Sequence, residues 1–155
     1  LQTQLETYRK VNSTNVQDEL NSIYSEMWKD DKAIGNIKIN SDYSMNIDGG
    51  ARDISSLSKG QRITLAVSFM MAISRTSTES PPPIIIDAPV GNLDGDLGIE
   101  FYQILANNNQ CIFFLLPDRE FIESNNEGKF IKKNSSKIYS VIREPSENIA
   151  KISNL

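Results

Sequence analysis

The feature that most constrains the fold is a short apolar run that ends in a carboxylate, Ile84-Ile85-Ile86-Asp87. Three prolines, Pro81 to Pro83, come directly before it. A wholly apolar run of this length is typical of a central parallel strand that is covered on both faces. A helical pattern from Leu97 to Leu105 and a second apolar run from Cys111 to Leu116 follow. Strand, helix and strand at this spacing predict a βαβ unit and an α/β fold.

The first 29 residues lack Pro and Gly and predict a helix. One apolar stripe follows the i, i+4, i+7, i+11 spacing of a helix face or coiled-coil seam and consists of Val16, Leu20, Ile23 and Met27. Two interpretations fit this stripe equally well. One is the end of a coiled coil that enters a globular domain, and the other is a simple amphipathic helix.

Two alternating segments come next and predict a β-hairpin. Their apolar positions are Ile37 and Ile39 in the first segment, and Tyr43, Met45 and Ile47 in the second. Asn40-Ser41-Asp42 separates the two segments, and Asp48-Gly49-Gly50 closes the second.

A second helix is predicted to begin at Ser58, because Ser58-Lys59-Gly60-Gln61 is a capping-box pattern in which the serine hydroxyl can accept the N3 backbone N–H. The helix is apolar on more than one face, so we expect it to be largely buried. The polar run Thr76 to Ser80 and the prolines end it. A further strand is predicted near Ile138 to Ile142.

Composition bounds the class of protein. A chain of 155 residues fits one compact domain, and its single cysteine, Cys111, excludes an internal disulfide. Histidine is absent, which excludes His-based catalysis and His–metal sites in this chain. The net charge of −4 argues against a main DNA-gripping surface. The nearest basic cluster is predicted to be a solvated loop, with a phosphate contact as the alternative, and consists of Lys129, Lys132, Lys133 and Lys137.

Two pieces of the sequence carry a chemical mechanism. Asp87 ends a predicted parallel strand, and ligands of such sheets bind at the carboxyl edge, where a carboxylate can hold Mg²⁺ beside a phosphate, usually through water. The second piece is Leu57 to Gln61, where a hydroxyl, a glycine and the free N–H groups of a helix start can bind an anion. Each piece alone has an ordinary structural explanation, a buried strand followed by Asp or a capped helix.

Together and in order, the motifs are much more specific. Leu57-Ser58-Lys59-Gly60-Gln61-Arg62, then Ile84-Ile85-Ile86-Asp87, then Gly91-Asn92-Leu93-Asp94 resembles the signature motif, Walker B motif and D-loop of ABC ATPases. The preceding coiled-coil end points to the chromosome-maintenance (SMC-like) branch rather than to transporters. The stretch from Ile86 to Asp94 looks most like the DNA sulfur-modification ATPase DndD and related phage-defence ATPases.

This resemblance implies specific roles. Asp87 would hold Mg²⁺ through water. Ser58, Lys59, Gly60 and Gln61 would bind the ATP of the opposite protomer, with Ser58 and Gly60 at the γ-phosphate. Asp94 would cross the dimer interface, and Arg62 would support the signature turn with Gln61. The implied cofactors are ATP and Mg²⁺.

Three departures from the family pattern stand out. Ala88 occupies the place of the usual catalytic glutamate, and Leu116-Pro117-Asp118 stands where a switch histidine is expected. The phosphate-cradling motif G-x-x-x-x-G-K-[ST] does not occur in the sequence. In coiled-coil ATPases that motif lies in the N-terminal lobe, so we expect this chain to be one lobe.

The resemblance therefore predicts the C-terminal lobe of an ABC ATPase head, with a mostly parallel central sheet flanked by helices. Residues 1–30 would be the coiled-coil end and residues 31–155 the lobe. The expected function is ATP hydrolysis coupled to DNA repair, modification or phage defence, at a head–head interface with an N-terminal lobe. The alternatives are a nucleotide-gated clamp that barely hydrolyses ATP, and an interaction module with a decayed site. Expected partners are the N-terminal lobe, a second head, DNA, and nuclease or modification subunits. The expected location is the prokaryotic cytoplasm, where association with the nucleoid is open.

Overall fold

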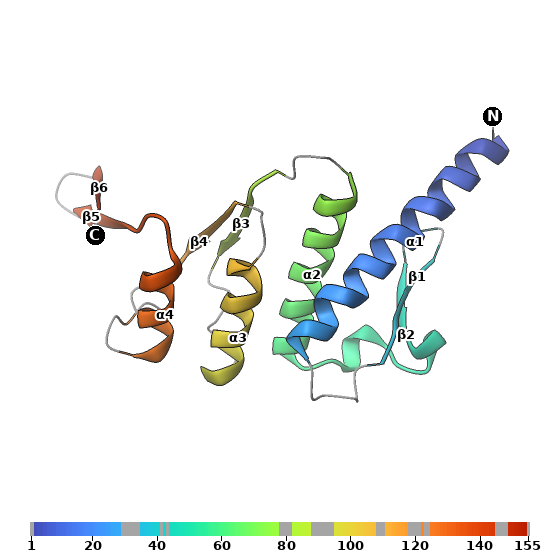
Figure 1. The fold of residues 1–155 in the computed structure, drawn as a ribbon, viewed down its shortest axis with the longest axis horizontal. Helices are drawn as coiled ribbons and strands as arrows, with labels where there is room; N and C mark the ends of the chain where they lie inside the picture. The colour runs from blue at the N-terminus through green and yellow to red at the C-terminus, as the bar shows by residue number, and fades with distance from the viewer. Residues whose placement is uncertain are drawn as a thin grey trace.

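The computed structural model describes residues 2–28, 35–40, 42, 44–77, 82–87, 95–107, 111–117, 122, 125–144 and 149–154. Figure 1 shows the elements in a row, with helix α1 (Gln2–Met27) and a hairpin of strands β1 (Ile37–Ile39) and β2 (Met45–Ile47) at one end. Helix α2 (Lys59–Ser77) comes next. Strand β3 (Ile84–Asp87), helix α3 (Gly95–Ala106) and strand β4 (Ile112–Leu115) follow, and the last elements are helix α4 (Asn126–Asn134) and strands β5 (Tyr139–Glu144) and β6 (Ile149–Asn154).

The apolar stripe predicted for α1 is confirmed as a buried helix face. Leu20 is fully buried, and Val16, Ile23 and Met27 are less than a tenth exposed. The stripe belongs to the hydrophobic core of this chain, together with residues of α2 and of the hairpin. The N-terminal turns of α1 project beyond the other elements (Figure 1). The assignment of residues 1–30 to a coiled-coil end stays a prediction.

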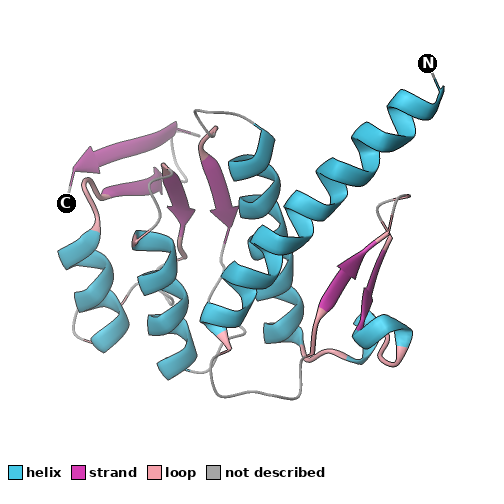
Figure 2. Ribbon diagram, turned by 45° about the vertical axis from the view of Figure 1, so that its right-hand side comes forward, coloured by secondary structure: helices cyan, strands magenta, loops and turns pink. Residues whose placement is uncertain are grey.

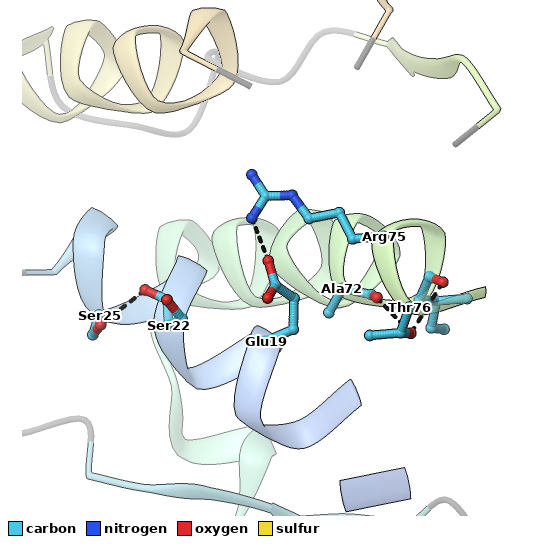
Figure 3. Close-up of polar contacts among 7 residues, drawn as sticks. Glu19, Ser22, Ser25, Ala72, Arg75 and Thr76 are labelled. Carbon is cyan, nitrogen blue, oxygen red and sulfur yellow. Dashed lines mark hydrogen bonds and ion pairs between the residues drawn. The ribbon is translucent and has the colours of Figure 1, made fainter. Parts of the chain in front are cut away.

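Helices α1 and α2 are packed in opposite directions. At one end of the helix pair, Glu19 of α1 forms an ion pair with Arg75 in the last turn of α2 (Figure 3). At the other end of the helix pair, Trp28, which directly follows α1, donates its indole N–H to Thr64, close to the beginning of α2, at 2.9 Å. The final turns of α1 therefore lie against the first turns of α2.

The β-hairpin is confirmed, with Ile37 opposite Ile47 and Ile39 opposite Met45 in an antiparallel ladder. Two amide side chains of α1 pair with the free edge of β1. Asn21 donates to the Ile37 carbonyl at 2.7 Å and accepts the Ile37 N–H at 2.9 Å, and Gln17 accepts the Ile39 N–H at 3.0 Å. The two amides are one helical turn apart and their partners are two positions apart on the same edge of β1, so the helix satisfies an edge that would otherwise be unpaired.

Helix α2 begins and ends where the sequence predicts, but its burial was overestimated. One face is buried and consists of Gly60, Thr64, Leu65, Val67, Ser68, Met71, Ala72 and Ser74. Met70 and Ile73 lie on the opposite face and are 43% and 41% exposed. The reason is that the described elements of this chain cover one side of the helix only.

The predicted βαβ unit is confirmed, because β3 and β4 pair in parallel and α3 connects them (Figure 2). The expectation that both sheet faces are covered was wrong for the described chain. Ile84 and Ile86 are buried on one face, whereas Ile85, Phe113 and Leu115 are 65%, 54% and 55% exposed on the other. The resemblance predicts a mostly parallel central sheet. Among the described residues, the parallel part of that sheet consists of two strands, β3 and β4.

The C-terminal part differs from the sequence interpretation at the lysine cluster. Lys129, Lys132 and Lys133 lie on helix α4, not on a loop. The helix forms because Asn125 caps it by accepting the Gly128 N–H at 2.6 Å, and Ile131 anchors it in the core. The predicted strand near Ile138 to Ile142 is present as β5, and β6 pairs with it in an antiparallel hairpin.

Candidate functional site

The capping box at the start of α2 is formed in full. The Gln61 N–H donates to the Ser58 hydroxyl oxygen at 3.2 Å, and the Ser58 N–H donates to Gln61 Oε1 at 2.9 Å. The Ser58 carbonyl accepts the Arg62 N–H at 3.0 Å, as the first bond of the helix. The side chains of Ser58 and Gln61 each bond the backbone N–H of the other residue, and these two reciprocal bonds fix the conformation of the turn.

The same turn combines exposed and buried groups. The side chains of Ser58 and Lys59 are exposed, Gln61 is half-buried and Gly60 is buried. Leu57, just before the turn, is 5% exposed and belongs to the core. The Ser58 hydroxyl oxygen accepts one bond and keeps its own proton as a donor. An exposed hydroxyl at a helix N-terminus is the arrangement in which an incoming anion can be bound.

The segment that leads into this turn is also held by local hydrogen bonds. The Asp53 carboxylate accepts the Ser55 N–H at 2.7 Å and caps a 3-10 turn at Ile54–Ser56. The Ser55 backbone N–H, with a smaller contribution from the Ser55 hydroxyl, holds the pKa of Asp53 below its usual value. This folded-state preference for the carboxylate is present at neutral pH and is lost as the pH falls through the lowered pKa.

Asp87 is the last residue of β3, and its backbone pairs in register with Leu115 at the end of β4. Its side chain is exposed. The alternation of burial along β3 explains this exposure, since Ile84 and Ile86 point into the core and the two residues between and after them point away. Asp87 therefore presents a carboxylate at the carboxyl end of a parallel strand pair, as the sequence predicts.

Other residues singled out from the sequence lie outside the described residues. They are the D-loop residue Asp94, its neighbours Gly91, Asn92 and Leu93, and Ala88 and Asp118. Leu116 and Pro117 follow β4 and are half-buried. The roles expected for Asp94 and Ala88 stay predictions.

Comparisons with known proteins show which solved structures have a similar fold. No protein-family model matches the sequence, and no curated protein matches it. Several solved structures do match. One, from structural work on ATP-driven dimerisation and DNA-stimulated activation of SMC ATPases, is 13% identical with a TM-score of 0.66 over 97% of this chain and 89% of that chain. The chain has the fold of an SMC head lobe.

Two further solved structures have a similar fold. The Smc head domain of Pyrococcus furiosus, with an extended coiled coil and the C-terminal domain of ScpA bound, is 16% identical with a TM-score of 0.59 over 92% of this chain. The SMC head domain of Thermotoga maritima is 15% identical with a TM-score of 0.57 over 91% of this chain. This chain spans 35% and 47% of those two chains. The predicted α/β fold of a C-terminal head lobe is confirmed. In the part of the chain that the structure describes, no helix is long and apolar enough to cross a membrane.

Sequence reasoning missed three residues that support the candidate site. The Tyr24 hydroxyl donates to the Gln61 carbonyl at 3.3 Å. Thr64 accepts the Trp28 indole N–H and donates to the carbonyls of Gly60 and Gln61, at 3.1 and 3.0 Å. The contacts of Trp28 and Tyr24 join residues 36 and 37 positions apart, so no local pattern could have indicated them.

Proposed function

We propose that this chain is the C-terminal lobe of an SMC-like ATPase head, which binds and hydrolyses ATP at a head–head interface when an N-terminal lobe completes it. The observation that carries the proposal is the fully formed capping box that leaves the Ser58 hydroxyl exposed at the N-terminus of α2, on the fold of an SMC head lobe. In this role Ser58 contacts the γ-phosphate of an ATP molecule held by the partner head, and Lys59, Gly60 and Gln61 complete the contact.

The exposed apolar surface supports the completion by another lobe. Ile85, Phe113 and Leu115 share the open face of the β3–β4 pair and are each more than half exposed. A parallel sheet is normally covered on both faces, because its strands are connected by segments that cross it. We infer that the N-terminal lobe of the same protein covers this face and adds strands to the pair. That lobe would also supply the phosphate-binding loop that this sequence lacks.

Asp87 fits a limited role in binding Mg²⁺. Among the described residues no group of three or more Asp, Glu, Cys or His side chains lies close enough to hold a metal ion. Within the described residues, Asp87 offers a carboxylate at the end of β3, which suits Mg²⁺ beside a nucleotide, since that ion keeps several waters and takes further ligands from the phosphates. The bound ion would neutralise charge on the phosphates, and Asp87 would position it. Asp94 is the second catalytic residue of the proposal and acts across the interface.

The pathway is part of the proposal. The order of motifs and the stretch from Ile86 to Asp94 favour a DNA-processing role in repair, modification or phage defence, close to DndD. DNA, a second head and nuclease or modification subunits are the proposed partners, in the cytoplasm of a prokaryote. Ala88, in the place of the usual glutamate, favours a second candidate, a nucleotide-gated clamp with little or no hydrolysis.

The decisive variant is Ser58→Arg in the complete protein. If Ser58 faces a partner's ATP, the bulky side chain blocks the second head, so the variant binds ATP but does not dimerise with a non-hydrolysable analogue in light scattering. If Ser58 only caps α2, the variant loses about 1 kcal/mol of stability and dimerises normally. A normal ATP-induced dimer would remove the basis of the proposal. Measuring ATP turnover by the wild-type dimer then distinguishes the two candidate functions, since an ATPase turns ATP over and a nucleotide-gated clamp has little or no turnover.

A further inference from the structure

The last turn of α1 and the residue after it are bonded to the first turn of α2 through directional contacts. The Tyr24 hydroxyl reaches this turn at the Gln61 carbonyl, and the Trp28 indole N–H reaches the Thr64 hydroxyl in the next turn. One turn further along, the Ser68 hydroxyl donates to the Met27 sulfur at 3.6 Å. Tyr24 is 3% exposed and Thr64 is 1% exposed, whereas Trp28 and Gln61 are half-buried, so these bonds are partly shielded from water.

Thr64 lies at the centre of this set of contacts. Its oxygen accepts the indole proton, which can only be donated, and its own proton is shared between the carbonyls of Gly60 and Gln61. A chain of bonds therefore runs from Trp28 through Thr64 to the backbone of the turn that Ser58 caps. Buried hydrogen bonds depend on distance and angle, so they fix the rotation and axial position of α2 more narrowly than apolar contacts do.

The opposite end of the same helix pair is held differently. One polar contact there is the ion pair of Glu19 with Arg75, whose side chains are 30% and 37% exposed (Figure 3). Ion pairs at this exposure contribute little to stability and constrain geometry weakly. Tyr24 and Thr64, at the end that carries Ser58, are much less exposed than the two side chains of this ion pair.

We propose that Trp28 and Tyr24, acting through Thr64 and the Gln61 carbonyl, are positioning residues that set the place of the Ser58 hydroxyl relative to α1. The direction of α1 and the geometry of the Ser58–Gln61 turn are then coupled. The expected effect on the strength of ATP-dependent head dimerisation rests on the proposed function. The anchoring of the turn stands without that function.

The test uses the complete protein with Trp28→Phe, which removes the indole N–H and keeps an aromatic ring. Thr64→Val removes the hydroxyl at nearly constant shape, and Thr64→Ser restores the hydroxyl. We expect faster hydrogen exchange at the amides of Gln61 and Arg62 in Trp28→Phe and Thr64→Val, and near wild-type exchange in Thr64→Ser. The dissociation constant of the dimer formed with a non-hydrolysable ATP analogue should rise about threefold to tenfold, as expected for one lost buried hydrogen bond. ATP binding by the separate heads should be unchanged.

Glu19→Gln is the matched control, because it weakens the same helix pair at the end away from Ser58. It should leave both the exchange of the turn and the dimer unchanged. Unchanged exchange in Trp28→Phe and Thr64→Val would overturn the anchoring, whatever the protein does with ATP. A second outcome is that Trp28→Phe and Thr64→Val show faster exchange but a normal dimer, while Ser58→Arg abolishes the dimer. That outcome would overturn the positioning role and leave the proposed function standing. A normal dimer in Ser58→Arg as well would overturn the proposed function and, with it, the positioning role.

Discussion

Replacing Ser58 by glycine and by alanine separates a helix cap from a ligand contact. In the structure the Ser58 hydroxyl accepts the Gln61 N–H at 3.2 Å, and this bond satisfies one donor that the helix cannot pair internally. Alanine at such a position costs about 1 kcal/mol of stability, whereas glycine, whose backbone is easily solvated, costs only a few tenths. Both variants remove the same hydroxyl.

The two hypotheses therefore predict different outcomes for dimerisation. If Ser58 is only a cap, both variants dimerise with ATP as wild type does and differ only in stability, which is lower for alanine than for glycine. If the hydroxyl contacts a partner's ATP, both variants lose the contact and dimerise equally poorly. A lost hydrogen bond to a charged phosphate corresponds to about 1.5 to 3 kcal/mol, or roughly tenfold to a hundredfold per contact, and a symmetric dimer of either variant loses two such contacts.

Asn125 provides a matched cap remote from the candidate site. It caps α4 by accepting the Gly128 N–H at 2.6 Å, so Asn125→Ala should cost a similar free energy, measured by urea denaturation. The same variant should dimerise with ATP as wild type does. The reasoning is refuted if Ser58→Gly dimerises normally, or if Asn125→Ala weakens the dimer as much as Ser58→Ala does.

Three further predictions follow from the fold and the site. Asp87→Asn in the complete protein should sharply lower ATP turnover at limiting Mg²⁺ with unchanged thermal stability, because the carboxylate charge holds the ion; unchanged turnover would count against the Walker B role. The isolated 155-residue chain should show no micromolar binding of Mg-ATP in calorimetry, since it lacks a phosphate-binding loop; a one-to-one micromolar isotherm would contradict this. Val16→Ala should cost about 1 to 2 kcal/mol in urea denaturation and Val11→Ala close to nothing, because Val16 is 8% and Val11 is 52% exposed on the same helix; equal losses would mean that the stripe is not part of the core.

Local patterns predicted the elements of this chain well. The stripe of α1, the capping box at Ser58 and the strand that ends in Asp87 each depend on spacing within a few residues, and the structure contains all three. The lysine-rich helix α4 was missed because it is only nine residues long and rich in polar side chains, and its signals are limited to the preceding Asn125 cap and the buried Ile131.

Burial was predicted less well, for a physical reason. The apolar run in β3 and the apolar faces of α2 indicate elements covered on all sides, yet Ile85 and Ile73 are exposed in this chain. Hydropathy records how much surface a residue must bury but not which chain segment buries it. The contact of Trp28 with Thr64 was invisible for a related reason, since it depends on how α1 crosses α2 and not on any spacing in the sequence.

Mixing two inactive variants tests most directly the claim that Ser58 and Asp87 act in different heads of one dimer. The complete Asp87→Asn and Ser58→Ala proteins are each assayed for ATP turnover, alone and as an equal mixture. If Ser58 acts on the partner's ATP, each mixed dimer has one site with both defects and one intact site, so about a quarter of all sites are restored in a symmetric dimer. The account predicts that the mixture hydrolyses ATP well above either variant alone. Turnover no greater than the average of the two variants would contradict it, because every site in a mixed dimer would then carry one of the two defects.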